Sequence, residues 1–313
     1  MVDLSSRSRL CLTGADGKRF LHGQVTNEVN KLNVCEGCYA ALVTAKGKLV
    51  SDLNIYCLPE EILLDFEPGL TRRVTERLEK YIIADDVQVI DVAPHYGLIS
   101  IQGPKAPETV TDLNWFGSLP AARYQLVTAK AEGGDLYCAN HPRGAVAGFD
   151  LFVPVAEVEN VMRGAEAAGA IRCSPEALDM LRIEAGIPRF GVDMDETNLA
   201  PEAIEATAIS YAKGCYIGQE VISRIRAYGQ VAKALRGLKL STIGQRGDKL
   251  FAGDTEVGYI TSALASPTFN AIIGLGYVRR EHNQIGTTLL LRNESGEGEG
   301  TIVPLPFKAA DLK

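Results

Sequence analysis

The 313-residue sequence contains no run of 18 or more apolar residues, so no part of it is expected to span a membrane. It has no excess of basic residues either, because 32 Lys and Arg stand against 39 Asp and Glu, giving a net charge of −7. Direct nucleic-acid binding is therefore not expected, since phosphate neutralisation needs clustered basic side chains. The first ten residues include an early Asp and lack the apolar core of a secretory signal, which favours a cytoplasmic protein.

Cysteine is too scattered for a disulfide scaffold. The seven cysteines are an odd number spread from position 11 to position 215, which is typical of a protein in a reducing compartment. Cys35 and Cys38 form a CxxC pair, but the sequence has no second CxxC or HxxxH that would complete four zinc ligands. The residues after the pair read as a strand, whereas a thioredoxin-like motif needs a helix. No metal site is expected.

The first 225 residues alternate between strand-like and helix-like patterns. The length suggests two domains, and 46% hydrophobic residues are ordinary for a globular protein. The interleaved patterns predict an α+β region with more than one sheet. The expected strands are residues 8–14, 38–44, 53–58, 61–66, 86–91, 98–103, 135–140 and 150–154, and the expected helices are 16–25, 70–82, 158–165, 174–186 and 216–227.

The pattern changes after about residue 230. Short apolar runs follow one another between Gly, Asn, Asp and Pro turns, without helical periodicity, and this predicts a small C-terminal β-barrel. The run 295–300 is expected to be a hairpin loop. The expected domains are 1–228, a two-lobe region, and 229–313, the barrel.

The most distinctive segment is residues 213–220, KGCYIGQE. Gly214 is expected to let the chain turn into the helix predicted at 216–227, so Cys215 would lie near a helix N-terminus. The helix dipole and Lys213 would then favour the thiolate form of Cys215. A half-buried cysteine that only packs fits its position equally well. The motif residues of interest are Lys213, Gly214, Cys215, Tyr216, Gly218, Gln219 and Glu220.

Two carboxylates are further candidates. Glu184 is expected in the last turn of a helix, where the dipole disfavours a negative charge, so a ligand-binding role is worth considering. It could pair with the parallel N–H donors of a pterin-like ring, although a solvated helix-end glutamate is favoured on physical grounds alone. Asp52 follows a Gly-Lys turn and could orient a ligand nitrogen, although a turn aspartate that caps backbone N–H groups is again favoured.

KGCYIGQE resembles the signature of the YgfZ family of folate-binding proteins, relatives of the glycine-cleavage T-protein (aminomethyltransferase). Further segments are similar to landmarks of that family in the same order, so the resemblance covers nearly the whole chain. These segments are LTGADGKRFLHGQVTNEV, GKLVSDLNIY, IQGP, LRIEAGIPRFGVDMDETNLAPE, VGYITSA and LGYV.

The resemblance implies two interleaved α+β lobes and a C-terminal barrel, with tetrahydrofolate in a central hole. It also implies that Glu184 contacts the pterin and that Asp52 lies near the reacting nitrogen of the folate. Arg224 would be a partner for the carboxylates of the glutamate tail, a task suited to a guanidinium.

The two branches of this superfamily differ at informative positions. Aminomethyltransferases usually carry an acidic residue at the position of Cys215 and paired aspartates where this chain has Ser51 and Asp52. The resemblance therefore favours an accessory protein that supports iron–sulfur cluster assembly or repair in client enzymes, tRNA-modifying ones among them, with Cys215 as its working thiol. The alternative is a folate-dependent aminomethyltransferase that uses Asp52.

Overall fold

The computed structural model describes residues 1–131, 133–229, 231–293 and 296–312. The chain packs into two compact units. The N-terminal unit comprises Met1–Pro175 and Glu205–Gln219, and the barrel unit comprises Glu176–Ile204 and the chain from Glu220 onward. The predicted boundary at residues 228 and 229 stays a prediction, because these packing units interleave along the chain.

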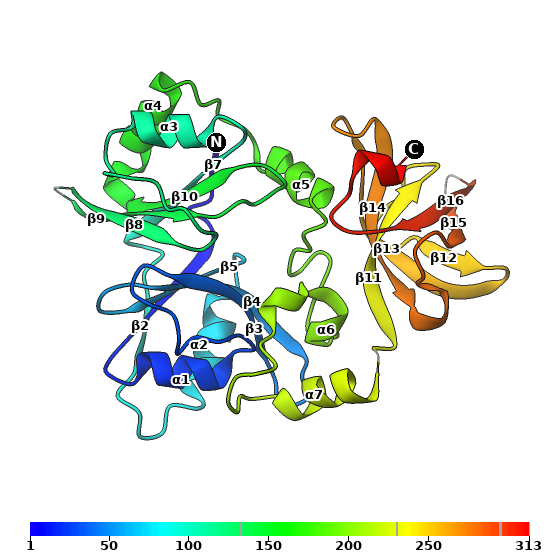
Figure 1. Ribbon diagram of the computed structural model, residues 1–313, viewed down its shortest axis with the longest axis horizontal. Helices are drawn as coiled ribbons and strands as arrows, with labels where there is room; N and C mark the ends of the chain where they lie inside the picture. Colours follow the sequence, from blue (N-terminus) through cyan, green and yellow to red (C-terminus); the bar gives the residue numbers. More distant parts are fainter. Residues whose placement is uncertain (132, 230, 294–295, 313) are drawn as a thin grey trace. The chain divides into compact units, whose positions relative to one another are not determined.

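The N-terminal unit contains two five-stranded antiparallel sheets (Figure 1). The first has the strand order β3-β4-β5-β2-β6, and the helices α1 and α2 belong to the same part of the chain. Their bounds are β2 Ser8–Thr13, α1 Gly17–Gln24, β3 Gly37–Val43, β4 Leu49–Cys57, β5 Ile62–Phe66, α2 Thr71–Glu79 and β6 Gln88–Asp91.

The second sheet has the order β1-β7-β10-β9-β8. Because β1 opens the chain and pairs with β7, the chain begins in one sheet, builds the other and then returns, which interleaves the two lobes. The bounds are β1 Val2–Asp3, β7 Tyr96–Gln102, α3 Ala106–Asp112, β8 Leu126–Ala131, β9 Gly134–Asn140, β10 Gly148–Pro154 and α4 Val158–Ala167.

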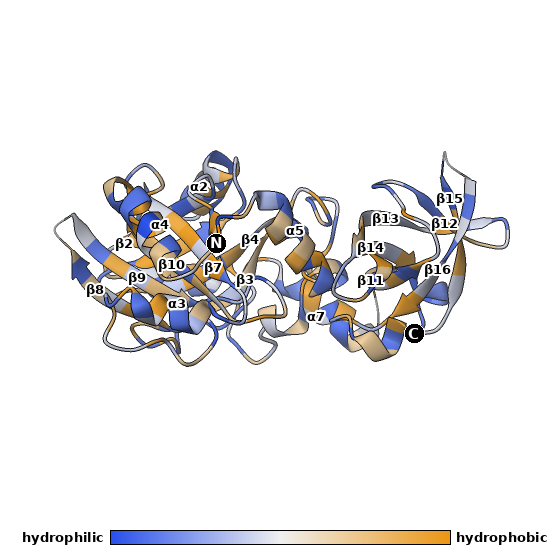
Figure 2. Ribbon diagram, turned by 90° about the horizontal axis from the view of Figure 1, so that it is seen from above, coloured by the Kyte–Doolittle hydropathy of each residue, from blue (hydrophilic) through white to orange (hydrophobic). Residues whose placement is uncertain are grey.

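Side-chain alternation divides each sheet into two buried faces. On the first sheet, Leu10, Leu64 and Ile55 pack into a core with residues of α1 and α2, whereas Tyr56 and Leu63 point to the opposite face. That opposite face packs against side chains of the second sheet, and the second sheet packs its other face against α3 and α4. Figure 2 shows hydrophobic residues concentrated in the sheets and hydrophilic residues on outer helices and loops.

The barrel unit is built around a closed six-stranded barrel in the order β11-β14-β13-β12-β15-β16. Leu238, Leu250, Ile260 and Leu291 are among the fully buried residues of its core. The bounds are α5 Pro175–Glu184, α6 Ala200–Ala203, α7 Gln219–Tyr228, β11 Lys233–Leu240, β12 Lys249–Ala252, β13 Thr255–Ser266, β14 Ala271–Arg279, β15 Thr288–Asn293 and β16 Gly296–Val303.

The predicted fold class is confirmed: an α+β region with two sheets precedes a closed β-barrel. The hairpin predicted from residues 53–66 is also present, with Cys57 opposite Ile62. The prediction of a loop at residues 295–300 is wrong for residues 296–300, because these residues belong to strand β16, Gly296–Val303. Ser295 lies outside the described residues. The glycines of this run do not mark a turn, since Gly296, Gly298 and Gly300 all pair with neighbouring strands of the barrel.

Candidate functional site

Asp52 lies inside strand β4 rather than in the turn before it, so the prediction that it caps a turn is wrong. Its Oδ2 atom accepts a hydrogen bond from the Tyr39 hydroxyl at 3.0 Å. Its Oδ1 atom is buried and has no hydrogen-bond partner among the described residues. Burial and the nearby Glu67 raise the pKa of Asp52 to about 6, although Arg7 and Tyr39 act in the opposite direction. A carboxyl with a pKa raised to this value can take up and release a proton near neutral pH.

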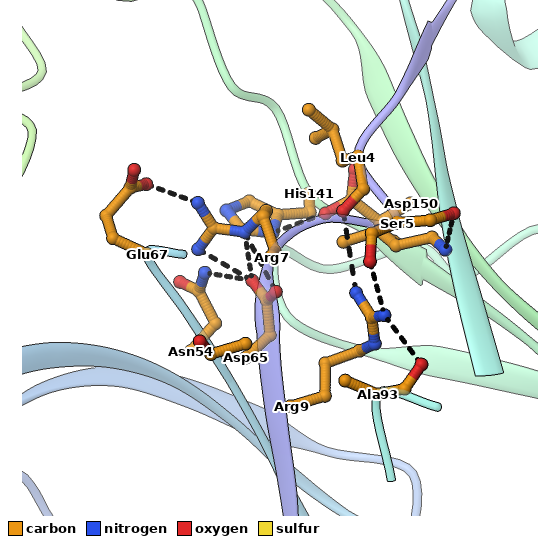
Figure 3. A network of polar contacts seen from close by, with 12 residues as sticks. Leu4, Ser5, Arg7, Arg9, Asn54, Asp65, Glu67, Ala93, His141 and Asp150 are labelled. Atoms are coloured by element: carbon orange, nitrogen blue, oxygen red, sulfur yellow. Dashed lines mark hydrogen bonds and ion pairs between the residues drawn. The ribbon is translucent and has the colours of Figure 1, made fainter. Parts of the chain in front are cut away.

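A buried ion-pair network lies on the same face of the first sheet (Figure 3). Asp65 on β5 is fully buried and accepts hydrogen bonds from Arg7 Nε at 2.8 Å, Asn54 Nδ2 at 2.9 Å and Arg143 at 3.3 Å. Burial alone would raise the pKa of Asp65, but the two guanidinium groups lower it overall. The carboxylate is therefore charged and fully engaged, which makes it a structural group.

Arg143 extends this network to the second sheet. Its guanidinium also binds Asp150 on β10, with a nitrogen–oxygen distance of 2.6 Å, and Asp150 lies 3.0 Å from Nδ1 of His141. The same His141 nitrogen lies 3.0 Å from the Tyr56 hydroxyl on the first sheet. The two sheets are thus joined by charge as well as by apolar packing.

The motif segment 213–218 is anchored in the N-terminal unit by Lys213. This side chain is buried, and its Nζ donates to the backbone carbonyls of His22, Val25 and Asn27 at 2.5–2.7 Å. Burial lowers the pKa of Lys213 to about 8. Its ammonium group also lies 4.9 Å from the centre of the Tyr216 ring. Lys213 therefore holds the motif segment against the end of α1 and the loop that follows it. Its predicted effect on the thiol of Cys215 stays a prediction.

The geometry around Cys215 differs from the prediction in two ways. The helix α7 begins at Gln219, so Cys215 lies four residues before it and not at its N-terminus. The glycine that needs a left-handed backbone is Gly218, with φ of +86°, and not Gly214. The thiol of Cys215 is exposed, so the reading of a half-buried packing cysteine is also wrong. Cys215 is thus an exposed residue two positions after Lys213, whose side chain anchors the segment.

In the barrel unit, Glu184 lies in the last turn of its helix, as predicted, and is the residue at which α5 ends. It is 6% exposed, so the expectation of a solvated glutamate is wrong. Its carboxylate accepts hydrogen bonds from the hydroxyls of Ser266 and, at 2.9 Å, Thr268. These hydroxyls hold the carboxylate in place and leave it further acceptor capacity, since a carboxylate offers about four acceptor sites.

Arg224 forms an exposed ion pair with Glu220 one turn earlier on α7, at 2.6 Å. The structure thus brings Arg224 and Glu220 together in the barrel unit, while Gln219 is the residue at which α7 begins. Asp52 and residues 213–218 belong to the N-terminal unit, and Glu184 belongs to the barrel unit.

Sequence reasoning missed several polar residues. In the barrel unit, buried Asp193 binds Arg182, and it accepts hydrogen bonds from Thr261 and Ser262 at 2.6 Å. These bonds attach the segment after α5 to strand β13. A signal was available for Asp65 and Asp150, because each is a single charged residue within an otherwise apolar strand. Their partners could not be read from the pattern, since they come from distant strands and loops.

Over the ranges that the structure describes, no group of three or more His, Cys, Asp and Glu side chains could hold a metal ion. Within the same ranges, no helix has the length and apolar character needed to cross a membrane.

Comparisons with known proteins agree with this architecture. A solved glycine cleavage system aminomethyltransferase T from Bartonella henselae superposes with a TM-score of 0.89 at 20% identity, over 98% of this chain and 86% of the other, which shows a shared fold. An aminomethyltransferase of Rubrobacter xylanophilus is 29% identical over 315 residues, or 98% of this chain and 82% of the relative. A putative chloroplastic transferase of Arabidopsis thaliana is 28% identical over 313 residues, or 99% of this chain and 71% of the relative.

Two family models account for most of the sequence. The GCVT N-terminal domain matches residues 1–213, and the glycine cleavage T-protein C-terminal barrel domain matches residues 233–308. The first match includes the Asp52 strand and ends at Lys213, and the second covers the strands of the closed barrel. The chain therefore belongs to the glycine cleavage T-protein (GCVT) family.

Proposed function

We propose that the protein binds a reduced folate, tetrahydrofolate, and that Asp52 contacts the reacting nitrogen of this ligand. The observation that carries the proposal is the buried Oδ1 atom of Asp52, which has no partner among the described residues. An N–H donor on a ligand would satisfy this atom, and leaving it without a donor is costly. The raised pKa of Asp52, about 6, suits a group that takes up and returns a proton.

The activity best supported is folate-dependent aminomethyl transfer. Relatives that match nearly the whole chain are named aminomethyltransferases. In this reaction the methylene carbon of an aminomethyl group on a carrier protein forms bonds to two nitrogens of tetrahydrofolate, and its bonds to the carrier and to the amino group break. The products are methylenetetrahydrofolate, ammonia and the free carrier. In this chain Asp52 would bind the folate nitrogen and hold its proton at Oδ1. Glu184 is proposed separately as an acceptor for pterin N–H groups, because Ser266 and Thr268 leave its carboxylate further acceptor capacity.

Titration calorimetry with tetrahydrofolate tests the binding proposal. Asp52→Asn keeps the shape of the side chain but removes its charge, and Glu184→Gln does the same at the second carboxyl. Each variant should lose about thirtyfold in affinity, the equivalent of about 2 kcal/mol for a lost charged hydrogen bond. Asp112→Asn, at an exposed position of α3, is the matched control and should bind as the wild type does. Wild-type affinity in both variants would remove these carboxyls from the folate site.

Release of ammonia and formation of methylenetetrahydrofolate from a loaded aminomethyl carrier test the transfer reaction. Wild-type protein should form both products in equal amounts, and Asp52→Asn should form neither at a comparable rate. Folate binding without either product would reject aminomethyl transfer and leave the binding proposal standing.

A second candidate function is favoured by one observation, the exposed thiol of Cys215 on an anchored loop. This thiol fits the YgfZ-type role, in which the protein would support iron–sulfur client enzymes in the cytoplasm with Cys215 as the working group. Cys215→Ser should then fail to restore iron–sulfur enzyme activity in cells that lack the protein. Cys173→Ser, which alters another exposed cysteine outside the motif, should restore it. Equal restoration by both variants would reject a role for the Cys215 thiol.

A further inference from the structure

The two oxygens of the Asp52 carboxyl differ in their hydrogen bonding. Oδ2 accepts the Tyr39 hydroxyl at 3.0 Å, whereas Oδ1 is buried without a partner among the described residues. A carboxyl with a single fixed oxygen has a defined orientation, because rotation about its last bond would break that hydrogen bond. The hydroxyl of Tyr39 therefore decides in which direction Oδ1 points.

The strand register explains how Tyr39 reaches Asp52. Tyr39 on β3 lies opposite Asn54 of β4, and Asp52 lies opposite Ala41. Tyr39 and Asp52 are thus diagonal neighbours on one face of the sheet, a spacing that an aromatic side chain can bridge. Tyr39 is itself fixed by its surroundings, since its backbone carbonyl accepts from the Asn27 amide at 2.8 Å and its ring packs in the cluster between the two sheets.

We propose that Tyr39 is the positioning residue for Asp52, because its hydroxyl holds Oδ2 and so directs Oδ1 at the N–H donor of a bound ligand. The identity of that ligand as a reduced folate rests on the proposed function; the coupling between Tyr39 and Asp52 does not.

Burial and nearby charged groups set the protonation states of Asp52 and Tyr39. Glu67, just after β5, and Arg7, just before β2, act on Asp52 with opposite signs. Burial and Asp52 raise the pKa of Tyr39 well above its usual value, and Tyr124 and Glu205 act in the same direction. The phenol therefore stays protonated and serves as a permanent donor. Its hydrogen bond stabilises the charged form of Asp52 against burial.

Titration of the Asp52 carboxyl in the full-length protein without ligand tests the coupling directly. Carbon NMR can follow the carboxyl resonance, which Asp52→Asn identifies by its loss. Tyr39→Phe removes only the hydroxyl that stabilises the charged carboxylate, so the midpoint should lie about one pH unit above that of the wild type. Tyr137→Phe is the matched control, because Tyr137 packs in the same cluster, and it should leave the midpoint unchanged.

Calorimetry with tetrahydrofolate across pH 5 to 8 gives the second measurement. The pH at which affinity changes should rise in Tyr39→Phe in parallel with the carboxyl midpoint, while Tyr137→Phe should follow the wild type. An unchanged Asp52 midpoint in a folded Tyr39→Phe variant would overturn the role of Tyr39. Absence of folate binding by the wild type would instead reject the proposed function, and the ligand-free titration would still decide the coupling.

Discussion

The Lys213 ammonium group donates a hydrogen bond of 2.7 Å to the backbone carbonyl of Val25, a residue 188 positions earlier in the chain. Val25 immediately follows α1, where helix carbonyls lack intrahelical partners. Lys213 therefore satisfies acceptors at the end of α1 and just after it, and it attaches the motif segment to this part of the N-terminal unit. The buried charge is tolerated because three carbonyls surround it.

Lys213→Met is expected to destabilise the protein by about 3 kcal/mol, because the carbonyls of His22, Val25 and Asn27 all lose their donor while the apolar stem is kept. Urea unfolding followed by circular dichroism measures the change. Lys130→Met, at an exposed lysine of the same unit, should alter stability by less than about 0.5 kcal/mol. Equal stability of the two variants would contradict the anchoring role.

Two glycines of the motif should respond differently to alanine. Gly218 has φ of +86°, and a Cβ there would lie 2.5 Å from the Thr44 carbonyl oxygen, so Gly218→Ala should cost about 2 kcal/mol or more. A Cβ at Gly214 would meet only His22 Nε2, at 3.8 Å, so Gly214→Ala should be nearly neutral. Thermal unfolding of the two variants provides the comparison. A Gly218→Ala variant as stable as Gly214→Ala would contradict this backbone geometry.

Asp52 should make the stability of the protein depend on pH. Burial and Glu67 raise its pKa from 3.8 to about 6, so the folded protein retains a proton that the unfolded chain releases. The stability contributed by this group is present below about pH 4 and is lost as the pH rises through about 6. Asp52→Asn should therefore come close to the wild type at pH 4 and exceed it by about 3 kcal/mol at pH 7.

Urea titrations of both proteins at pH 4, 5, 6 and 7 measure this difference. Asp112→Asn, at an exposed carboxyl, should follow the wild-type profile. A stability difference between Asp52→Asn and the wild type that does not vary over this range would show that Asp52 does not titrate there.

Thiol exposure should decide the order of alkylation. Cys173 and Cys215 are exposed, whereas Cys11 and Cys138 are buried and burial raises the pKa of both thiols far above the usual value. Iodoacetamide at pH 7.5 should therefore label the two exposed cysteines first, as peptide mass spectrometry can show. In Cys215→Ser a single fast site, Cys173, should remain. Fast labelling of Cys11 in the folded protein would contradict the described packing.

Local patterns were enough to predict the barrel and most of the strands and helices before it, whereas β1, α3 and β8 were not predicted. Leu10, Leu64 and Ile55 show why, since alternation along each strand already marks one buried face. Glu184 and the motif at 213–220 could also be selected from their local positions, whereas the ligand role expected for Asp52 came from the family resemblance. These signals depend only on neighbours within a few residues.

The tertiary structure decided what those residues do. Whether Asp52 caps a turn or meets Tyr39 depends on the register between β3 and β4. The partners of Glu184 come from the last residue of β13 and the turn after it, 82 and 84 residues away. The burial of Lys213 likewise depends on carbonyls at the far end of the sequence. Sequence periodicity reports which side of an element is apolar, but hydrogen bonds form between particular atoms, and only the packed chain brings those atoms within 3 Å of one another.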